Sequence, residues 1–190
     1  MISKDLLVKI DRGREGLNKG LPHGFNRLVD YIPGIQQGTY YLVGAESGIG
    51  KSAIVNNSFC FTPIDWYLAN KHNTNIKLKI HYYSFEIAKD LMLYKAACRK
   101  IFIDTGILLD INYILSRGKN RISDEHYTLV SDSLNYFDEM NDILYVSDKV
   151  ENPTGIWHKE LTYANSQGKG LIEHNNGFEF KGDYTPNDPN

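Results

Sequence analysis

The chain has 190 residues and a formal net charge of −2, and 42% of its residues are hydrophobic and 23% charged. This is the composition of an ordinary globular domain, long enough to bury one full core. The near-neutral total gives no sign of a nucleic-acid or membrane partner, although a local basic strip can lie within a neutral total.

The lack of recognisable targeting signals and the cysteine usage both favour a cytoplasmic setting. No apolar run approaches membrane-spanning length, and the N-terminus lacks a signal-peptide core. Cys60 and Cys98 show no metal-ligand spacing, so we expect free thiols in a reducing compartment. We therefore expect a cytoplasmic protein, or one in the host cytoplasm if the source is viral.

The first 22 residues form an amphipathic start, which we interpret as a linker or docking arm. Leu6, Leu7 and Ile10 fall on one side of a helix. Three glycines and a proline then loosen the chain. We assign residues 23–190 to a single domain.

Strand-like and helix-like segments alternate through this domain. Helices are predicted over residues 24–32, 52–61, 62–68, 88–102, 107–115, 123–140 and 153–166. Strands are predicted over residues 39–43, 78–85 and 143–146, with a β-hairpin over residues 171–180. Alternation of this kind predicts an α/β fold, with a mainly parallel sheet flanked by helices.

The most informative segment is residues 44–52, which read GAESGIGKS. From Ala45 onward it fits the phosphate-binding loop pattern G-x-x-x-x-G-K-[ST], with Ala in place of the first Gly. Gly48 and Gly50 allow successive backbone N–H groups to point at an anion, helped by the positive end of the following helix. Lys51 would reach the β- and γ-phosphates, and the Ser52 hydroxyl would ligate Mg²⁺.

This pattern predicts a nucleoside-triphosphate site that uses Mg²⁺, and the family resemblance described below implies that the nucleotide is ATP. A Gly-rich turn with a chance Gly-Lys-Ser is the competing interpretation. The predicted strand before the loop and helix after it argue against chance. The predicted nucleotide-binding residues are Ala45, Glu46, Ser47, Gly48, Ile49, Gly50, Lys51, Ser52 and Ala53.

Hydrolysis also needs a group that orients the attacking water, and Glu86 is the best candidate. It follows the second predicted strand directly, and strand ends of this architecture face the ligand crevice. The alternative is a glutamate in the first turn of the next helix, stabilised by that helix dipole. With Lys51, Glu86 completes the predicted catalytic pair.

Two short runs before the loop carry a family resemblance. Residues 20–28 read GLPHGFNRL and residues 34–38 read GIQQG, directly ahead of the strand and the loop. Residues 84–87, SFEI, approximate a Phe-Ser-Leu-Glu-Met segment, and residues 152–156, NPTGI, begin a helix after the third strand. Together these features resemble the RecA-like ATPase domain of DnaB-type replicative helicases.

The resemblance covers residues 20–167 and implies a RecA-like P-loop NTPase core. It implies that Glu86 is the catalytic base, that the working form is a ring-shaped homo-oligomer, and that single-stranded DNA is a partner. Divergent flanks suggest a phage replication system. Ala45, His23 and Val29 depart from the family, which has Gly, usually Thr and commonly Asp at these places.

A larger departure lies near the end of the chain. The family continues to a hydrophobic strand whose terminal Asp holds Mg²⁺ through water, whereas this chain closes with the turn-rich YTPNDPN. We therefore expect a core that is incomplete at its C-terminus. Asp148 is the nearest substitute metal ligand, although a strand-end Asp in a turn is the simpler interpretation.

Several alternatives remain open at this stage. A recombinase- or clock-type RecA-like ATPase would share the loop, and a truncated module could bind nucleotide without turnover. A small-molecule kinase would need a lid and an acceptor site, which we do not find. Arg117, Lys119 and Arg121 form a basic loop, for which solvation explains the charge better than nucleic-acid contact, because no aromatic residues interleave.

Overall fold

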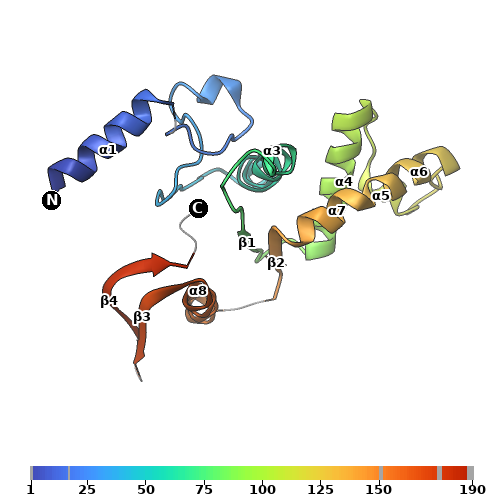
Figure 1. Cartoon of the computed structure of the whole chain (residues 1–190). Helices are drawn as coiled ribbons and strands as arrows, with labels where there is room; N and C mark the ends of the chain where they lie inside the picture. Colours follow the sequence, from blue (N-terminus) through green and yellow to red (C-terminus); the bar gives the residue numbers. More distant parts are fainter. Residues whose placement is uncertain (1, 17, 150–151, 175–176, 188–190) are drawn as a thin grey trace.

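The structure is a computed structural model that describes residues 2–16, 18–149, 152–174 and 177–187. At its centre β1 (Ile80–Tyr83) and β2 (Leu144–Ser147) pair in parallel, with Ile80 opposite Leu144 and Tyr83 opposite Ser147. In the described residues this sheet has these two strands. Helix α3 (Thr62–Asn70) lies on one side of it and α8 (Pro153–Gln167) on the other (Figure 1).

A continuous helical run follows the glycine-rich loop, where two helices were predicted. It consists of α2 (Lys51–Val55), the π-helical segment η2 (Asn56–Phe61) and α3. Pro63, in the first turn of α3, has no N–H to donate, and its ring crowds the carbonyl one turn earlier. The Thr62 amide bonds to the carbonyl of Asn57, five residues back, so the ladder widens where the proline enters.

The helices between β1 and β2 in the chain extend away from the two termini, toward the right in Figure 1. They are α4 (Lys89–Thr105), α5 (Ile111–Ile114), α6 (Asp124–Asp132) and α7 (Leu134–Asn141). Ser123 caps α6 by accepting a hydrogen bond from the His126 amide at 3.3 Å. The single helix predicted over residues 123–140 is interrupted at Ser133, whose hydroxyl donates to the Val130 carbonyl at 2.7 Å.

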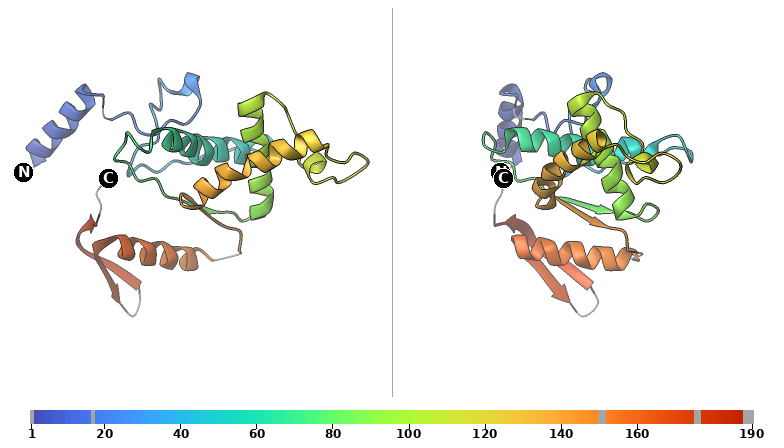
Figure 2. Two further views of the ribbon diagram at one scale, coloured as in Figure 1. Left: turned by 45° about the vertical axis from the view of Figure 1, so that its right-hand side comes forward. Right: turned by 90° about the vertical axis from the view of Figure 1, so that its right-hand side faces the viewer.

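Both ends of the described chain carry elements outside the central sheet. Helix α1 (Ile2–Arg14) projects from the body (Figure 2), and the predicted helix over residues 24–32 is reduced to the 3₁₀ turn η1 (Asn26–Leu28). Strands β3 (Gly168–His174) and β4 (Gly177–Pro186) form an antiparallel hairpin that is longer than predicted. Its predicted turn, residues 175–176, lies outside the described residues. No described helix combines the length and apolar character needed to cross a bilayer.

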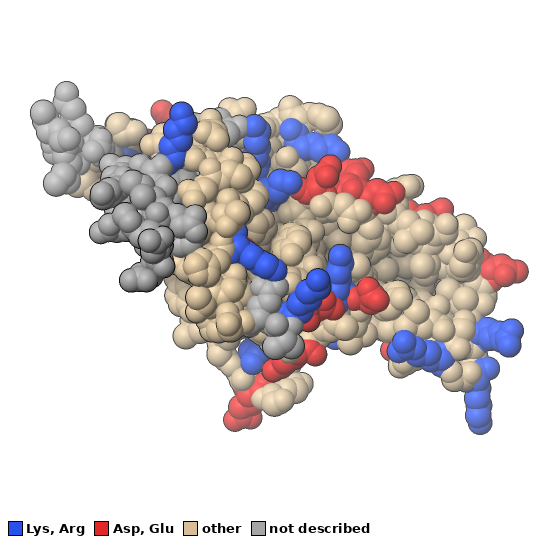
Figure 3. Space-filling model, turned by 90° about the horizontal axis from the view of Figure 1, so that it is seen from below, with Lys and Arg blue, Asp and Glu red and all other residues tan. Residues whose placement is uncertain are grey.

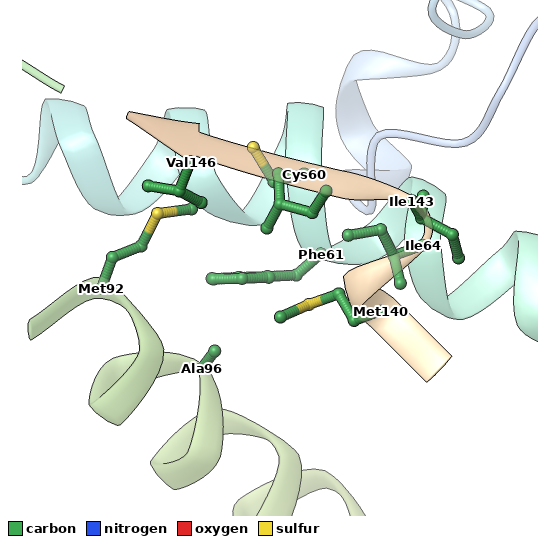
Figure 4. Packing of buried hydrophobic residues seen from close by; sticks show 9 residues of the cluster. Cys60, Phe61, Ile64, Met92, Ala96, Met140, Ile143 and Val146 are labelled. Carbon is green, nitrogen blue, oxygen red and sulfur yellow. The ribbon is translucent and has the colours of Figure 1, made fainter. Parts of the chain in front are cut away.

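One hydrophobic cluster joins the sheet to the helices packed against it (Figure 4). Its buried members are Cys60, Phe61, Ile64, Met92, Ala96, Met140, Ile143, Leu144 and Val146. They come from the helical run after the loop, from α4 and α7, and from β2 and the residue before it. The carboxyl half of the helical run is therefore fixed by burial against the rest of the domain.

The predicted strand over residues 39–43 does not form. The segment has no ladder partner in the described structure, and Tyr40 and Leu42 are 86% and 82% exposed. Tyr41 and Val43 are half-buried, and the Tyr41 ring lies 5.4 Å from that of Phe59 on the following helix. Strand propensity alone does not create a strand, because the ladder hydrogen bonds need a neighbour.

Candidate nucleotide-binding site

A pocket of about 550 Å³ lies between residues 39–43, the start of α2 and the carboxyl end of β1. Lys51 and Ser52 line it from the helix, and Glu86 lines it from the turn after the strand. The volume falls within the range of roughly 300–1,000 Å³ that is typical of small-molecule sites. The structure thus brings together three predicted site residues that are separated by up to 35 positions, from Lys51 to Glu86.

The glycines of the loop are required by backbone conformation. Gly48 and Gly50 have φ values of 83° and 96°, in the left-handed region that favours glycine. No described atom lies within 4 Å of a Cβ added at either position, so crowding is not the reason for glycine. Among the described residues Ser116 is the non-glycine with positive φ, so Ala45 occupies the first position of the pattern without strain.

The start of the helix supplies Lys51, Ser52 and free backbone amides to the pocket. Gly50 precedes α2, and its carbonyl accepts from the Ile54 amide at 3.0 Å, so the backbone becomes helical directly after the loop. The first amides of a helix have no acceptor within the helix and are available to an anion. Lys51 is exposed and Ser52 is half-buried, which leaves the ammonium in solvent and the hydroxyl at the wall.

Glu86 is presented by a turn that Ser84 holds. The buried Ser84 hydroxyl donates to the Ile87 carbonyl at 2.6 Å and accepts from the Ile87 amide at 3.1 Å. These two bonds close the chain around Phe85 and Glu86, which are both exposed. Ser84 was not among the predicted site residues, although a serine that can bond to backbone groups a few residues on is the signal of such a turn.

Asp148 does not line the pocket. It follows β2, and its Oδ2 accepts a hydrogen bond from the Lys89 amide, the first residue of α4, at 2.8 Å. A carboxylate at this place also complements the positive end of the helix dipole. In this structure Asp148 therefore stabilises the start of α4.

Two buried polar side chains of the π-helical segment η2, which the sequence did not point to, lie between pocket-lining residues Val55 and Phe59 in the chain. Asn56 and Ser58 are 5% and 4% exposed, and neither Asn56 Oδ1 nor Ser58 Oγ has a hydrogen-bond partner among the described residues. Burial raises the pKa of the nearby Tyr82 phenol, Cys60 adds to the rise, and a hydrogen bond with Asn56 opposes it. The phenol of Tyr82, which lines the pocket, is therefore neutral at physiological pH.

A second polar group connects α8 to the pocket wall. Glu160 accepts from the Tyr83 hydroxyl at 2.7 Å and contacts His81 Nδ1 at 2.8 Å. The His81 ring also packs edge-on against Tyr163 at 4.4 Å between centroids. Nothing in the sequence placed Glu160 near β1, since 77 residues separate it from Tyr83.

Metal ligands and basic residues give no second candidate site. Within the described part of the chain, no three or more His, Cys, Asp or Glu side chains are grouped so that they could hold a metal ion. Arg117, Lys119 and Arg121 are all exposed in the connection between α5 and α6. Basic side chains gather at that end of the molecule (the right-hand end of Figure 3).

Comparison with known proteins does not assign the chain. No protein-family model matches it, and a search of curated proteins gives no match. The function is therefore argued from the residues of the pocket.

Proposed function

We propose that the chain is a RecA-like P-loop domain that binds ATP with Mg²⁺ and hydrolyses the γ-phosphate. The observation that carries the proposal is the convergence of Lys51, Ser52 and Glu86 on one pocket. The loop that precedes the helix has glycines at the two positions where φ is positive. These are the groups that phosphate binding and water activation each require.

The phosphate chain would lie along the loop, residues 45–53. Backbone N–H groups of the loop and of the first helical turn would donate to phosphate oxygens, and Lys51 would neutralise the charge between the β- and γ-phosphates. A Cβ added at Gly48 or Gly50 would meet no described atom within 4 Å apart from its chain neighbours, so the loop is open on that side. Ser52 is the residue that would hold Mg²⁺, which shields the phosphate charge when bound.

Glu86 would orient the water that attacks the γ-phosphorus. As the new oxygen–phosphorus bond forms, the bond from the γ-phosphorus to the β–γ bridging oxygen breaks, and the water proton passes to the carboxylate. The Ser84 turn keeps Glu86 at the carboxyl end of β1, on the same pocket as the loop. ADP and inorganic phosphate leave, and the carboxylate then releases its proton to solvent.

Within this class, the proposal is a domain of the DnaB-like replicative helicase type. Support comes from the runs at residues 20–28 and 34–38 and from the parallel pairing of the strand that precedes Glu86 with the strand that precedes Asp148. A ring of copies acting on single-stranded DNA, in a phage replication system and in the host cytoplasm, belongs to this proposal. A recombinase- or clock-type ATPase would use the same pocket.

One observation favours a second candidate, a module that binds nucleotide without turnover. Asp148, the substitute for a second acidic metal ligand, bonds to the Lys89 amide and lies outside the pocket lining. A site in which Ser52 is the one residue assigned to the metal, with Glu86 assigned to the water, would bind magnesium nucleotide less firmly and position it less well for attack. Turnover measurements separate the two candidates.

Calorimetric titration with magnesium and ATP tests binding. We expect saturable binding to the wild-type chain and a loss of at least about tenfold in affinity for Lys51→Ala, because one charge-assisted contact is worth about 1.5–3 kcal/mol. Lys119→Ala, which removes an exposed lysine outside the pocket, is the matched control and should bind as the wild type does. Absence of saturable heat at millimolar ATP in folded wild-type protein would refute the proposal.

Phosphate release under the same conditions tests hydrolysis. Glu86→Gln should bind ATP normally while turnover falls by about 10²–10⁴-fold, the usual contribution of a general base. Glu125→Gln, an exposed position in the first turn of α6, is the control. Binding without wild-type turnover across a range of protein concentrations would decide for the module that only binds nucleotide.

A further inference from the structure

We propose that Arg99 of α4 is a positioning residue for the candidate nucleotide site, because it bridges two parts of the helical run that carries Lys51 and Ser52. The inference rests on the proposed function and adds to it a residue outside the pocket lining. Arg99 acts through the helix, since it fixes the orientation of the open amino end of the run relative to the packed carboxyl half.

The helical run needs such a contact because it changes geometry between its two ends. Its π-helical segment, residues 56–61, lies between α2 and α3. The Thr62 amide bonds five residues back, to the Asn57 carbonyl, and Pro63 follows directly. π-Helical turns and prolines are common causes of bends in helices. The direction of α2, and with it the position of Lys51, therefore depends on what holds the run across this segment.

Arg99 contacts the run at three points that are spaced four residues apart. Its Nε donates to Asn57 Oδ1 at 2.8 Å, and its Nη1 donates to Asp65 Oδ2 at 2.8 Å. Between these two contacts, the guanidinium carbon lies 5.5 Å from the centroid of the Phe61 ring. Residues four apart are neighbours on one face of a helix. One side chain thus spans the widened segment, from its second residue to the first turn of α3.

The far end of this Arg99 bridge lies in the packed region. Ala96 of α4 and Phe61 both belong to the buried hydrophobic cluster (Figure 4). The second carboxylate oxygen of Asp65 accepts from the Tyr136 hydroxyl of α7 at 2.9 Å, so Asp65 is also held by another helix. The bridge therefore connects Asn57 to parts of the domain that are fixed by burial.

The contacts require a guanidinium group. Its planar fork of N–H donors can serve two acceptors while its face stacks on an aromatic ring, whereas a lysine ammonium is a compact point charge. The side chains of Arg99 and Asp65 are 21% and 33% exposed, so solvent screens their charges only in part. Sequence alone gave no sign of this role, because Arg99 lies in a different helix from Asn57 and Asp65.

Backbone hydrogen bonds connect Asn57 to the start of the helix. The Asn56 amide bonds to the carbonyls of Ser52 and Ala53, so the bridged segment continues into the first turn without a break. Asn57 follows Lys51 within two helical turns. A rotation of the helix at Asn57 would therefore move the Lys51 ammonium and the Ser52 hydroxyl together.

Hydrogen–deuterium exchange on the nucleotide-free full chain tests the bridge itself. Asn57→Ala removes the contact nearest the loop and keeps the ion pair between Arg99 and Asp65, which makes it milder than replacement of Arg99. Amides of residues 54–58 should exchange at least about fivefold faster, because a hydrogen bond to a charged group is lost, whereas residues 66–70 should exchange as in the wild type. Asn57→Asp keeps an acceptor for Arg99 and should restore the wild-type rates.

Calorimetric titration with magnesium and ATP tests the link to the site. Asn57→Ala should bind at least about fivefold more weakly than the wild type, because Lys51 and Ser52 are no longer held in place. Asn57→Asp should bind as the wild type does. Tyr136→Phe is the matched control, since it removes a hydrogen bond to Asp65 and leaves the contact with Asn57 intact. It should change neither the affinity nor the exchange of residues 54–58.

Three outcomes would overturn the inference. Equal acceleration of exchange in residues 54–58 and 66–70 would mean that Asn57 contributes only to general stability. Unchanged exchange in Asn57→Ala would mean that Arg99 does not hold the segment, and faster exchange with wild-type affinity would mean that the bridge does not position the site. Absence of ATP binding by the wild type would refute the proposed function instead, and the exchange pattern would still decide whether Arg99 holds the helix.

Discussion

The two ends of the helical run after the loop differ in how far they are buried. Its carboxyl half packs into the hydrophobic cluster, where Ile64 is 0% exposed, and its amino end opens onto the pocket, beside a segment in which Tyr40 is 86% exposed. One helix therefore belongs to both regions. The comparison shows that the position of Lys51 and Ser52 is fixed by burial several turns away, while the groups themselves remain open to a ligand.

Truncation in the packed region should have the largest effect on stability. Ile64→Ala removes buried methyl and methylene groups from a fully enclosed position, so we expect the free energy of unfolding to fall by about 2–5 kcal/mol. Urea denaturation of the variant and the wild type measures this difference. Ile64→Val, which removes a single methylene group, should lower it by about 0.5–1.5 kcal/mol.

The same variants sharpen the comparison when nucleotide affinity is measured in folded protein. Ile64→Val should bind magnesium ATP as the wild type does, because the loop backbone is unchanged. Leu108→Ala, at an exposed position, should change stability by less than about 0.5 kcal/mol. An Ile64→Ala effect as small as that of Leu108→Ala would contradict the division into a packed and an open region.

The sequence predicted the elements of the packed region well because their signals are local. The apolar periodicity of residues 88–102 corresponds to α4, and the helix predicted over residues 153–166 corresponds to α8. The apolar runs at 78–85 and 143–146 contain β1 and β2. The predicted strand over residues 39–43 is wrong because it depends on a neighbour. The helix predicted over 123–140 is split because the side chain of Ser133 competes for a backbone carbonyl.

The candidate site, too, has features that the sequence predicted and features that it did not. The loop motif and a carboxylate at a strand end could be read from residue order, and Lys51, Ser52 and Glu86 do line one pocket. The supporting contacts could not be read, because they join distant positions. Glu160 reaches His81 and Tyr83 from another helix, and Asp148 reaches the start of α4 from the end of β2.

A pH dependence is expected from the thiol of Cys60, which belongs to the packed region. Burial raises the pKa of this thiol from 9.0 to about 12. Between these values the thiol is ionised in the unfolded chain and neutral in the folded chain, so the unfolded state binds fewer protons. This contribution to stability is complete below about pH 9 and is lost as pH rises toward 12, with a slope of up to about 1.4 kcal/mol per pH unit.

Urea denaturation at several pH values between 8 and 11 measures this slope. Cys60→Ala should be less stable at pH 8 because of the cavity, and its stability should decline less steeply above pH 9. Cys98→Ala is the matched variant: Cys98 is only partly buried, so its removal should change the slope less than removal of Cys60. Identical slopes in all three proteins would show that the Cys60 thiol is not shielded from solvent.

Replacement of two helix-end glycines should lower stability by less than Ile64→Ala does and should distinguish the loop from an ordinary helix end. Gly50 and Gly106 have φ values of 96° and 76°, and neither has a described atom within 4 Å of an added Cβ. Alanine at either position should therefore cost about 1–2 kcal/mol of unfolding free energy from backbone conformation alone.

Nucleotide affinity should separate these two variants, although their stabilities are similar. Gly106 ends α4, where its amide bonds to the Phe102 carbonyl, whereas Gly50 begins the helix that carries Lys51. Gly50→Ala should weaken magnesium ATP binding by at least about tenfold, since the loop amides would have to turn away from the anion. Gly106→Ala should leave the affinity unchanged, and equal losses in both variants would mean that lowered stability, rather than the geometry of the loop, controls binding.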